Sequence, residues 1–286
     1  MDVLQMEIPE RKVIDELIQR AFEEDIKSGD ITTDAIINKG RQADAVWCTK
    51  EQGIIAGLDI AKAVFRALDP KLEWHPKVED GDHVASGQLI VEISGSCRAI
   101  LSAERTALNL AQRMSGIATK THRLVEAIAG YPAKILDTRK TVPGLRQLDK
   151  YAVVAGGGTN HRMGLFDMAL IKDNHIVAAG SIAKAVEMVQ TQHPNVKIEV
   201  ETTSLDEVNE ALSAKADLIM LDNMNTDMMR EAVTLIDGKA KTEASGNITL
   251  QRVKEVAKTG VDYISVGALT HSVKAFDISQ TLRKIY

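Results

Sequence analysis

Basic side chains gather in the middle of the sequence, between Lys134 and Lys172. Arg139, Lys140 and Lys172 each come shortly after an apolar run, at the point where a strand would end. Arginine makes forked, bidentate contacts with carboxylates and phosphates, and lysine acts as a point charge. A single surface cation is usually only solvated, but this grouping in an acidic protein predicts a small polyanionic ligand.

A glycine-rich loop precedes two further candidates. Three successive glycines at 156–158 lead through Thr159 and Asn160 to His161 and Arg162. A triple glycine alone indicates no more than a turn. Because this one ends in His-Arg ahead of the next apolar run, it fits a loop that wraps closely around an anion.

Carboxylates stand at the ends of two successive apolar runs. Glu199 and Glu201 share one face of a predicted strand, since strand side chains alternate, and Asp222 closes the next strand. Among so many cations, these acids could bind Mg²⁺ together with phosphate oxygens, or they could orient sugar hydroxyls. The alternative is a buried ion-pair network that holds the lysines and arginines in place.

Small and polar residues follow the last two apolar runs. In β/α barrels the final loops often bind a phosphate through backbone N–H groups and a helix N-terminus. Their position at the end of the strand order favours that role over a simple turn or cap. The residues concerned are Ser245, Gly246, Asn247, Val266, Gly267 and Ala268.

The elements that position these residues alternate after residue 130. Apolar runs separated by segments of helical periodicity are typical of a parallel sheet. Every run ends in polar or glycine residues, which favours a β/α barrel over an open sheet with one switch point. The region is too short for eight units, so we expect an incomplete barrel of about six strands. The predicted strands are Lys134–Asp137, Met168–Ile171, Lys197–Val200, Leu218–Leu221, Thr242–Ala244 and Tyr263–Val266.

The first hundred residues follow another pattern. A helix is predicted over Ile14–Asp25, and short strand-like runs broken by turn residues predict a small antiparallel sheet with one or two helices. We therefore expect an N-terminal α+β domain at residues 1–105, joined by the C-terminal tail 273–286. The β/α barrel domain is expected at residues 106–272.

A long helix is predicted to begin at the junction of these domains. Ser102 fits the N-cap position of this helix, and Glu104 suits the positive end of its dipole. Arg105 is unfavourable at that end, which hints at an anionic partner for Arg105. An ion pair with a neighbouring acid explains Arg105 equally well.

Composition excludes several classes of protein. The chain has 286 residues, a net charge of −5 and 3% aromatic residues, so a nucleic-acid partner is not expected. Its apolar stretches are too short to span a membrane. The two cysteines lack CxxC spacing and fit a reducing compartment, so we expect a cytoplasmic protein.

Two long motifs point to one enzyme family. They are DTRKTVPGLR at Asp137–Arg146 and GGGTNHRMGL at Gly156–Leu165. Shorter segments agree in order along the chain: ERTALN (104–109), SGIAT (115–119), KDNH (172–175), EVE (199–201), LDN (221–223), EASGN (243–247) and SVGALTHS (265–272). From about residue 25 to residue 271 the sequence resembles quinolinate phosphoribosyltransferase, also called nicotinate-nucleotide pyrophosphorylase (carboxylating). Residues 53–95 contribute little to the resemblance.

The resemblance implies a reaction and its first substrate site. A phosphoribosyl group would pass from phosphoribosyl pyrophosphate to quinolinate with decarboxylation, giving nicotinate mononucleotide, CO₂ and pyrophosphate for de novo NAD biosynthesis. Arg139, Arg162 and Lys172 would hold the quinolinate carboxylates, with His161 and Thr138 beside them.

The resemblance also implies the second substrate site and a partner. Lys140 would face the pyrophosphate, and the loops at 245–247 and 266–268 would hold the 5′-phosphate. Glu201 and Asp222 would engage ribose hydroxyls or the cofactor Mg²⁺. They would contact the metal directly, or only through phosphate and water. Arg105 would reach in from a neighbouring subunit of a homodimer or an assembly of dimers. The predicted catalytic residues are Lys140, Lys172, Glu201 and Asp222.

Three other functions are weighed against this one. A Schiff-base aldolase or decarboxylase would use Lys172 as its nucleophile. The second alternative is a related phosphoribosyltransferase that acts on a different acid, for which Arg139 and Arg162 would be dispensable. A non-enzymatic carrier module is suggested by residues 79–93, which resemble a biotinyl or lipoyl hairpin but lack a lysine at the turn.

Overall fold

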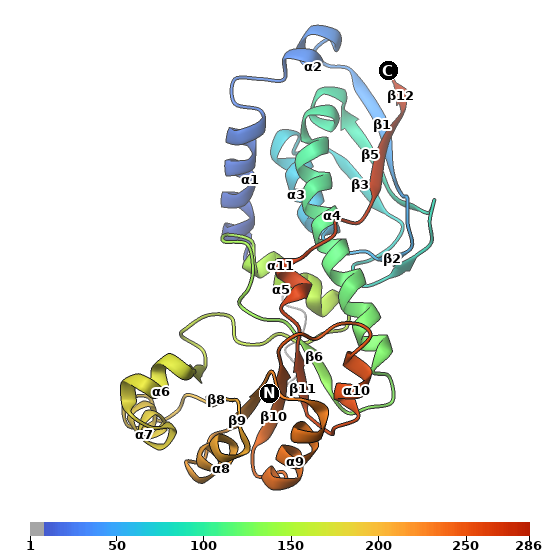
Figure 1. Ribbon diagram of the computed structural model, residues 1–286. Coiled ribbons are helices and arrows are strands. Elements are labelled where there is room, and N and C mark those ends of the chain that lie inside the picture. The colour runs from blue at the N-terminus through green and yellow to red at the C-terminus, as the bar shows by residue number, and fades with distance from the viewer. Residues whose placement is uncertain (1–8) are drawn as a thin grey trace. The chain divides into compact units, whose positions relative to one another are not determined.

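The computed structural model describes residues 9–286, which form two compact units (Figure 1). The described residues up to His122 make the first unit together with Val142–Gly157 and Ser272–Tyr286, and the second holds Arg123–Thr141 and Gly158–His271. The domain boundary expected at residue 105 therefore falls inside a helix of the first unit. The first eight residues of the domain expected at 1–105 lie outside the described residues.

The first unit is built on an antiparallel sheet in the order β12-β1-β5-β3. Its strands are β1 (Gln42–Thr49), β3 (Glu73–Pro76), β5 (Leu89–Ser96) and β12 (Ile278–Ile285). The small antiparallel sheet predicted from the sequence is confirmed, and the C-terminal tail supplies its edge strand. A separate two-stranded sheet pairs β2 (Gly53–Ile54) with β4 (His83–Val84).

Aromatic packing anchors the first unit. Trp47, Phe65 and Trp74 are buried, and their ring centroids lie 5.6–5.9 Å apart. Its described helices are α1 (Arg11–Asp25), α2 (Ile31–Ile36), α3 (Leu58–Leu68), most of α4 (Cys97–Ala127), and α5 (Arg146–Ala155). The first three lie in the segment for which one or two helices were expected.

The second unit contains a six-stranded parallel sheet in the order β6-β11-β10-β9-β8-β7. Because β6 and β7 are its two edges, the sheet does not close, and the predicted incomplete barrel of about six strands is confirmed. The strands are β6 (Lys134–Leu136), β7 (Ala169–Ile171), β8 (Ile198–Thr202), β9 (Leu218–Asp222), β10 (Lys241–Ser245) and β11 (Tyr263–Ser265).

Helices pack against the strands that they connect (Figure 1): α7 on β7 and β8, α8 on β8 and β9, and α10 on β11. The helices of this unit are α6 (Asp173–Ala179), α7 (Ile182–Gln192), α8 (Leu205–Ser213), α9 (Thr226–Ile236), α10 (Val253–Ala257) and α11 (Ala268–His271). Ser181, Ser204 and Asn225 cap α7, α8 and α9 through their side-chain oxygens. The caps of α8 and α9 lie two and three residues beyond the ends of β8 and β9, whereas α6 separates β7 from the cap of α7.

Two local predictions were wrong. Helix α4 begins at Cys97, because buried Cys97 and Ile100 extend its apolar face toward the N-terminus. Ser102 therefore lies inside the helix, and its hydroxyl donates to Asp30 instead of capping. The segment 79–93 is not a hairpin, since β4 pairs with β2 while β5 pairs with β1 and β3. The carrier-like interpretation loses its basis.

Candidate active site

A cavity of about 870 Å³ lies at the carboxyl ends of the parallel strands in the second unit. Every substrate-binding residue predicted from the sequence lines it, with the exception of Arg105. The predicted residues in its wall are Thr138, Arg139, Lys140, His161, Arg162, Lys172, Glu201, Asp222, Ser245, Gly246, Asn247, Val266, Gly267 and Ala268. Parallel strands align their carboxyl ends at one edge, which explains why residues so distant in sequence meet.

Strand β6 positions the loop that carries His161 and Arg162. The Thr159 N–H donates to the Ile135 carbonyl at 2.8 Å and the Thr159 carbonyl accepts from the Asp137 N–H at 3.3 Å, so the loop runs beside the strand. Buried Asp137, directly after β6, accepts from the His161 backbone N–H at 2.9 Å. The Arg162 guanidinium is 8% exposed and donates to the Met168 carbonyl at 2.9 Å. This arginine is therefore held in place before any ligand binds.

The two lysines reach the cavity from different strand ends. Lys172 directly follows β7, and its Nζ lies 2.6 Å from Oε2 of Glu201 on β8. The Lys140 carbonyl accepts from the Thr270 hydroxyl at 2.9 Å, and the stem of Lys140 packs against Gly267. A Cβ on Gly267 would lie 3.1 Å from Lys140 Cδ, so this glycine makes room for the lysine.

His161 is embedded in a buried acidic cluster. Its Nε2 lies 3.0 Å from Glu199 Oε2 and 3.3 Å from Glu243 Oε2, and both carboxyl groups are fully buried. Its Nδ1 accepts from the Arg162 backbone N–H at 2.7 Å. Both ring nitrogens are thus engaged within the protein, and His161 offers a ligand mainly its ring surface.

Proton sharing sets the charge of this cluster. Burial opposes a charged imidazole, but hydrogen bonds and charges from Glu199 and Glu243 outweigh it and raise the pKa of His161 to about 10. Burial and the charge of Glu243 raise the pKa of Glu199. These interactions favour a proton on His161 Nε2, the ring nitrogen that faces both carboxyl groups.

The loops after β9 and β10 are held in an unusual backbone conformation. Asn223, Gly246 and Asn247 have φ of 55°, 94° and 52°, in the left-handed region. The Asn247 amide donates to Asn223 Oδ1 at 3.2 Å, and the Asn223 amide donates to Asp222 Oδ2 at 2.7 Å. The predicted 5′-phosphate loop is therefore tied to one of the predicted ribose or metal ligands.

Two sets of side chains could hold a metal ion. Glu201 and Asp222, predicted from the sequence, offer carboxylate oxygens at neighbouring strand ends in the cavity. Hard oxygen donors that leave room for water and phosphate are what Mg²⁺ prefers. His161, Glu199 and Glu243 also come close enough to one another for a metal. Glu199 and Glu243 are fully buried and face His161, which leaves little room for water and phosphate, so the first set fits Mg²⁺ better.

Arg105 lies in the first unit, on an exposed face of α4. Because α4 begins at Cys97, Arg105 is in the third turn and the helix dipole does not disfavour it. The dipole argument for an anionic partner is therefore wrong. A role for Arg105 depends on the family resemblance alone.

Sequence reasoning missed several residues of the cavity wall. Glu243, His271 and Thr249 line it without having been predicted as site residues. Glu243 is the middle residue of β10, and strand alternation would have turned it to the same side as Ser245. That alternation is the available signal, because the contact between Glu243 and His161 depends on tertiary structure.

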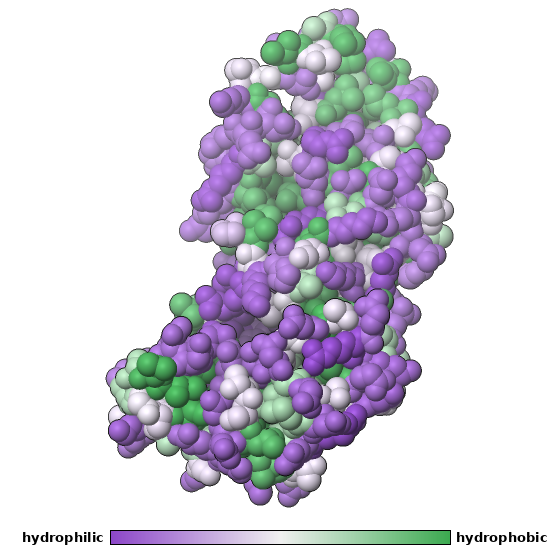
Figure 2. All heavy atoms as spheres, in the orientation of Figure 1, coloured by the Kyte–Doolittle hydropathy of each residue, from purple (hydrophilic) through white to green (hydrophobic). Residues whose placement is uncertain are grey.

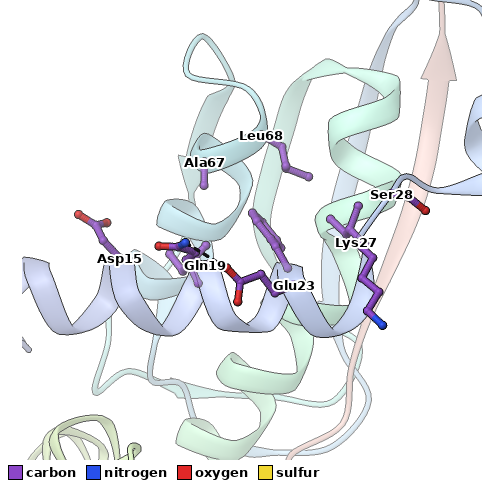
Figure 3. Close-up of a pocket in the computed structure, with 10 residues that line it drawn as sticks. Asp15, Gln19, Glu23, Lys27, Ser28, Ala67 and Leu68 are labelled. Carbon is purple, nitrogen blue, oxygen red and sulfur yellow. Dashed lines mark hydrogen bonds between the residues drawn. The ribbon is translucent and has the colours of Figure 1, made fainter.

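A second cavity, of about 840 Å³, lies in the first unit between α1 and α3 (Figure 3). Ile18, Phe22 and Leu68 make its lining largely apolar. Asp15 and Glu23 stand at its rim, and Gln19 donates to Glu23 at 3.0 Å. An apolar lining beside carboxylates does not suit polyanionic substrates, so the cavity at the strand ends is the better candidate.

Among the described residues, no helix combines the length and the apolar character that a membrane crossing requires.

Comparisons with known proteins agree with the fold. Residues 30–115 match the N-terminal domain and residues 117–281 the C-terminal domain described as quinolinate phosphoribosyl transferase. A curated relative from Nicotiana glauca, a mitochondrial quinolinate phosphoribosyltransferase [decarboxylating], is 48% identical over 92% of this chain and 80% of its own length. A probable nicotinate-nucleotide pyrophosphorylase [carboxylating] from Synechocystis is 46% identical over 91% of this chain and 90% of its own.

A solved structure gives the same result. The nicotinate-nucleotide pyrophosphorylase from Francisella tularensis superposes with a TM-score of 0.94 at 44% identity, covering 98% of this chain and 99% of that one. The fold and the cationic cavity define an α/β enzyme that acts on small anionic substrates. The chain belongs to the quinolinate phosphoribosyl transferase family.

Proposed function

We propose that the cavity at the strand ends is where this chain performs the reaction of its family, the decarboxylating phosphoribosyl transfer to quinolinate in de novo NAD biosynthesis. The observation that carries this proposal is the convergence of Arg139, Arg162, Lys140 and Lys172 on one cavity in a protein of net charge −5. A pyridine dicarboxylate and a phosphorylated sugar together bring several negative charges, which need a cationic pocket.

Quinolinate binds on the side of the cavity formed by the loops after β6 and β7. Arg162, buried and fixed by the Met168 carbonyl, is positioned for bidentate contact with a carboxylate, and Arg139 and Lys172 supply the remaining charge. The ring surface of His161 and the hydroxyl of Thr138 flank the pyridine. These contacts hold the ring nitrogen within attack distance of the anomeric carbon.

Phosphoribosyl pyrophosphate binds on the opposite side of the same cavity. The loops at 245–247 and 266–268 offer backbone N–H groups to the 5′-phosphate, and Glu201 and Asp222 orient the ribose hydroxyls. Lys140 stabilises the charge that grows on the departing pyrophosphate as the ribose gains oxocarbenium character. Lys172 pairs with Glu201, so quinolinate must compete with that carboxylate for the lysine.

Decarboxylation needs no further side-chain nucleophile. Bond formation makes the pyridine nitrogen cationic, and the electron pair left at the adjacent carbon when CO₂ departs is stabilised by that charge. A proton from water then adds to this carbon and completes nicotinate mononucleotide. Catalysis is then mostly positioning and electrostatics, with Lys140, Lys172, Glu201 and Asp222 as the main contributors. The Schiff-base alternative has no support in the contacts of Lys172, whose amine is paired with a carboxylate.

The proposal includes Mg²⁺ as cofactor. Glu201 and Asp222 would hold it, directly or through water and phosphate oxygens, since both carboxylates stand at neighbouring strand ends. When bound, Mg²⁺ would neutralise charge on the pyrophosphate leaving group.

The proposal also includes a homodimer, or an assembly of dimers, with Arg105 contributed by a second subunit. Large apolar side chains exposed on the second unit support an interface: Val177 on α6 is 81% exposed, and Leu165 and Phe166 are 74% and 79% exposed. Figure 2 shows hydrophobic side chains gathered over α6 and α7. Exposed Arg105 could reach a neighbour from α4. A cytoplasmic location stays a prediction from the cysteine content, and some named plant relatives are mitochondrial or chloroplastic.

One assay tests the proposed function. Purified protein is incubated with quinolinate, phosphoribosyl pyrophosphate and Mg²⁺, and CO₂ and nicotinate mononucleotide are measured. We expect both products in equal amounts, and none when nicotinate replaces quinolinate or when EDTA removes the metal. Borohydride should trap no adduct on Lys172. Absence of CO₂, or a borohydride adduct on Lys172, would contradict the proposal.

A further inference from the structure

Arg252 bridges the two left-handed loops from outside the cavity. Its guanidinium donates through one terminal nitrogen to the carbonyls of Gly246 at 3.1 Å and Asn247 at 3.5 Å. The other terminal nitrogen donates to the Met224 carbonyl at 3.0 Å. A single side chain, half-buried just before α10, therefore fixes the loops that follow both β9 and β10.

These carbonyl contacts determine where the adjoining N–H groups point. In a trans peptide the C=O and the next N–H are antiparallel, so holding the Gly246 carbonyl turns the Asn247 N–H away from Arg252. Holding the Asn247 carbonyl does the same for the Ile248 N–H. Asn247 and Ile248 both line the cavity, whereas Arg252 is not among the described residues that line it. Within residues 9–286, no hydrogen-bond acceptor engages either N–H.

The loops need this support because their conformation is not intrinsically favoured. Asn223 and Asn247 have φ of 55° and 52°, in the left-handed region, which residues other than glycine enter only at a cost in free energy. The Asn223 backbone N–H donates to the Ser245 carbonyl at 2.9 Å, and the two asparagine side chains are joined at 3.2 Å. The loops thus touch on the cavity side, and Arg252 joins them on the other.

We propose that Arg252 is a positioning residue for the phosphorylated substrate, because it preorganises the backbone N–H groups of residues 247 and 248 for an anion. The guanidinium also adds positive charge behind the loop. Arg252 acts through the loop backbone and does not touch the substrate, whereas Arg139 and Arg162 are proposed to contact quinolinate directly. This inference rests on the proposed function, since it assigns the phosphate to these loops.

The kinetic test separates the two substrates. Arg252→Ala should raise the KM for phosphoribosyl pyrophosphate about tenfold or more while leaving the KM for quinolinate within about twofold. Arg252→Lys keeps the charge but loses the fork, so it should recover only part of the loss. Millimolar guanidinium added to Arg252→Ala should lower the raised KM. The matched control is Arg230→Ala, an exposed arginine on α9 that pairs with Asp227.

Binding measured by calorimetry gives a readout independent of turnover. Phosphoribosyl pyrophosphate alone should bind Arg252→Ala and Arg252→Lys more weakly than wild type, and thermal unfolding should show that the variant compared is folded. If Arg252→Ala does not fold, Arg252→Lys carries the test. Unchanged affinity for phosphoribosyl pyrophosphate, or equal weakening of both substrates, overturns the proposal. If the wild type is active and the variants give either of these two results, the role of Arg252 is wrong and the proposed function stands. An inactive wild type would contradict the proposed function instead.

Discussion

At the scale of residues, the cavity is organised by groups that do not face the substrate. Glu199 and Glu243 are fully buried, yet they fix His161 through contacts of 3.0 and 3.3 Å, and the backbone of Arg162 donates to the same ring. The acidic cluster lies beside the cations and limits their mutual repulsion. Burial and the charge of Arg139 lower the pKa of Arg162, and the charge of Glu199 acts against that lowering. A cationic pocket can therefore exist without a bound ligand.

Replacing Arg162 with lysine tests the fork geometry. Arg162→Lys keeps the charge but loses the bidentate contact, so the KM for quinolinate should rise about ten- to hundredfold. The KM for phosphoribosyl pyrophosphate should change little. Arg230→Lys, on an exposed arginine, is the control. An unchanged quinolinate KM would exclude Arg162 as a carboxylate ligand.

The His161 cluster predicts how stability depends on pH. The fold raises the pKa of His161 from 6.5 to about 10, so it binds the proton more tightly than the unfolded chain does. The stabilisation is full below pH 6.5 and is lost as the pH rises through about 10. Urea unfolding at pH 7 and pH 10 should show a decrease of order 1–2 kcal/mol that is smaller in His161→Asn. The exposed His193→Asn should behave as wild type, and an equal decrease in all three proteins would contradict the assignment.

At the scale of elements, the parallel strands were predictable and several helices were not. Each strand of the second unit is a short apolar run that ends in polar residues, and all six were placed within about two residues. Helix α6 was missed because its sequence, DNHIVAA, directly follows the strand tail and is too short to show periodicity. Helix α2 has six residues, too few to show periodicity, although Asp30 caps it by accepting from the Thr33 N–H.

The candidate site was predictable to the extent that it follows strand ends. Arg139, Lys172, Glu201 and Asp222 could be found that way, because the topology brings every strand end to one edge. Strand alternation could have placed Glu243 on the cavity side of β10, but its contact with His161, and the contacts of Arg252, come from segments that are remote in sequence. Family resemblance, and not pattern, supplied the roles of individual residues.

The loop after β10 can be tested with a matched pair of glycines. Gly246 has φ of 94°, and a Cβ there would lie 2.1 Å from Asn223 Oδ1. Gly246→Ala should therefore displace the loop and raise the KM for phosphoribosyl pyrophosphate about tenfold or more. Gly180 has φ of 93° with open space around it, so Gly180→Ala should cost only about 1 kcal/mol of stability and leave both KM values unchanged. Equal kinetics for the two variants would contradict a phosphate role for this loop.

At the scale of the whole molecule, we propose a site that is shared between subunits of an oligomer. Arg105 belongs to the first unit and the cavity to the second, and the family resemblance assigns this arginine to a neighbour's site. A shared site requires that subunits complement one another.

Subunit mixing tests this sharing. Arg105→Ala and Arg139→Ala should each lose activity without unfolding, and mixing them should restore about a quarter of the wild-type activity, because half of the dimers are mixed and one of their two sites is intact. Mixing Arg139→Ala with Arg162→Ala, which damage the same cavity, should restore nothing. Absence of recovery in the first mixture, with exchange of subunits verified, would exclude a shared site.

The central claim is that the cations at the strand ends bind quinolinate, and equilibrium dialysis with radiolabelled quinolinate measures this binding directly. The wild type should bind one quinolinate per cavity, and a double variant, Arg139→Gln with Arg162→Gln, should bind it at least about a hundredfold more weakly while remaining folded. Equal binding by both folded proteins would contradict the account, because the diacid would then be held somewhere else.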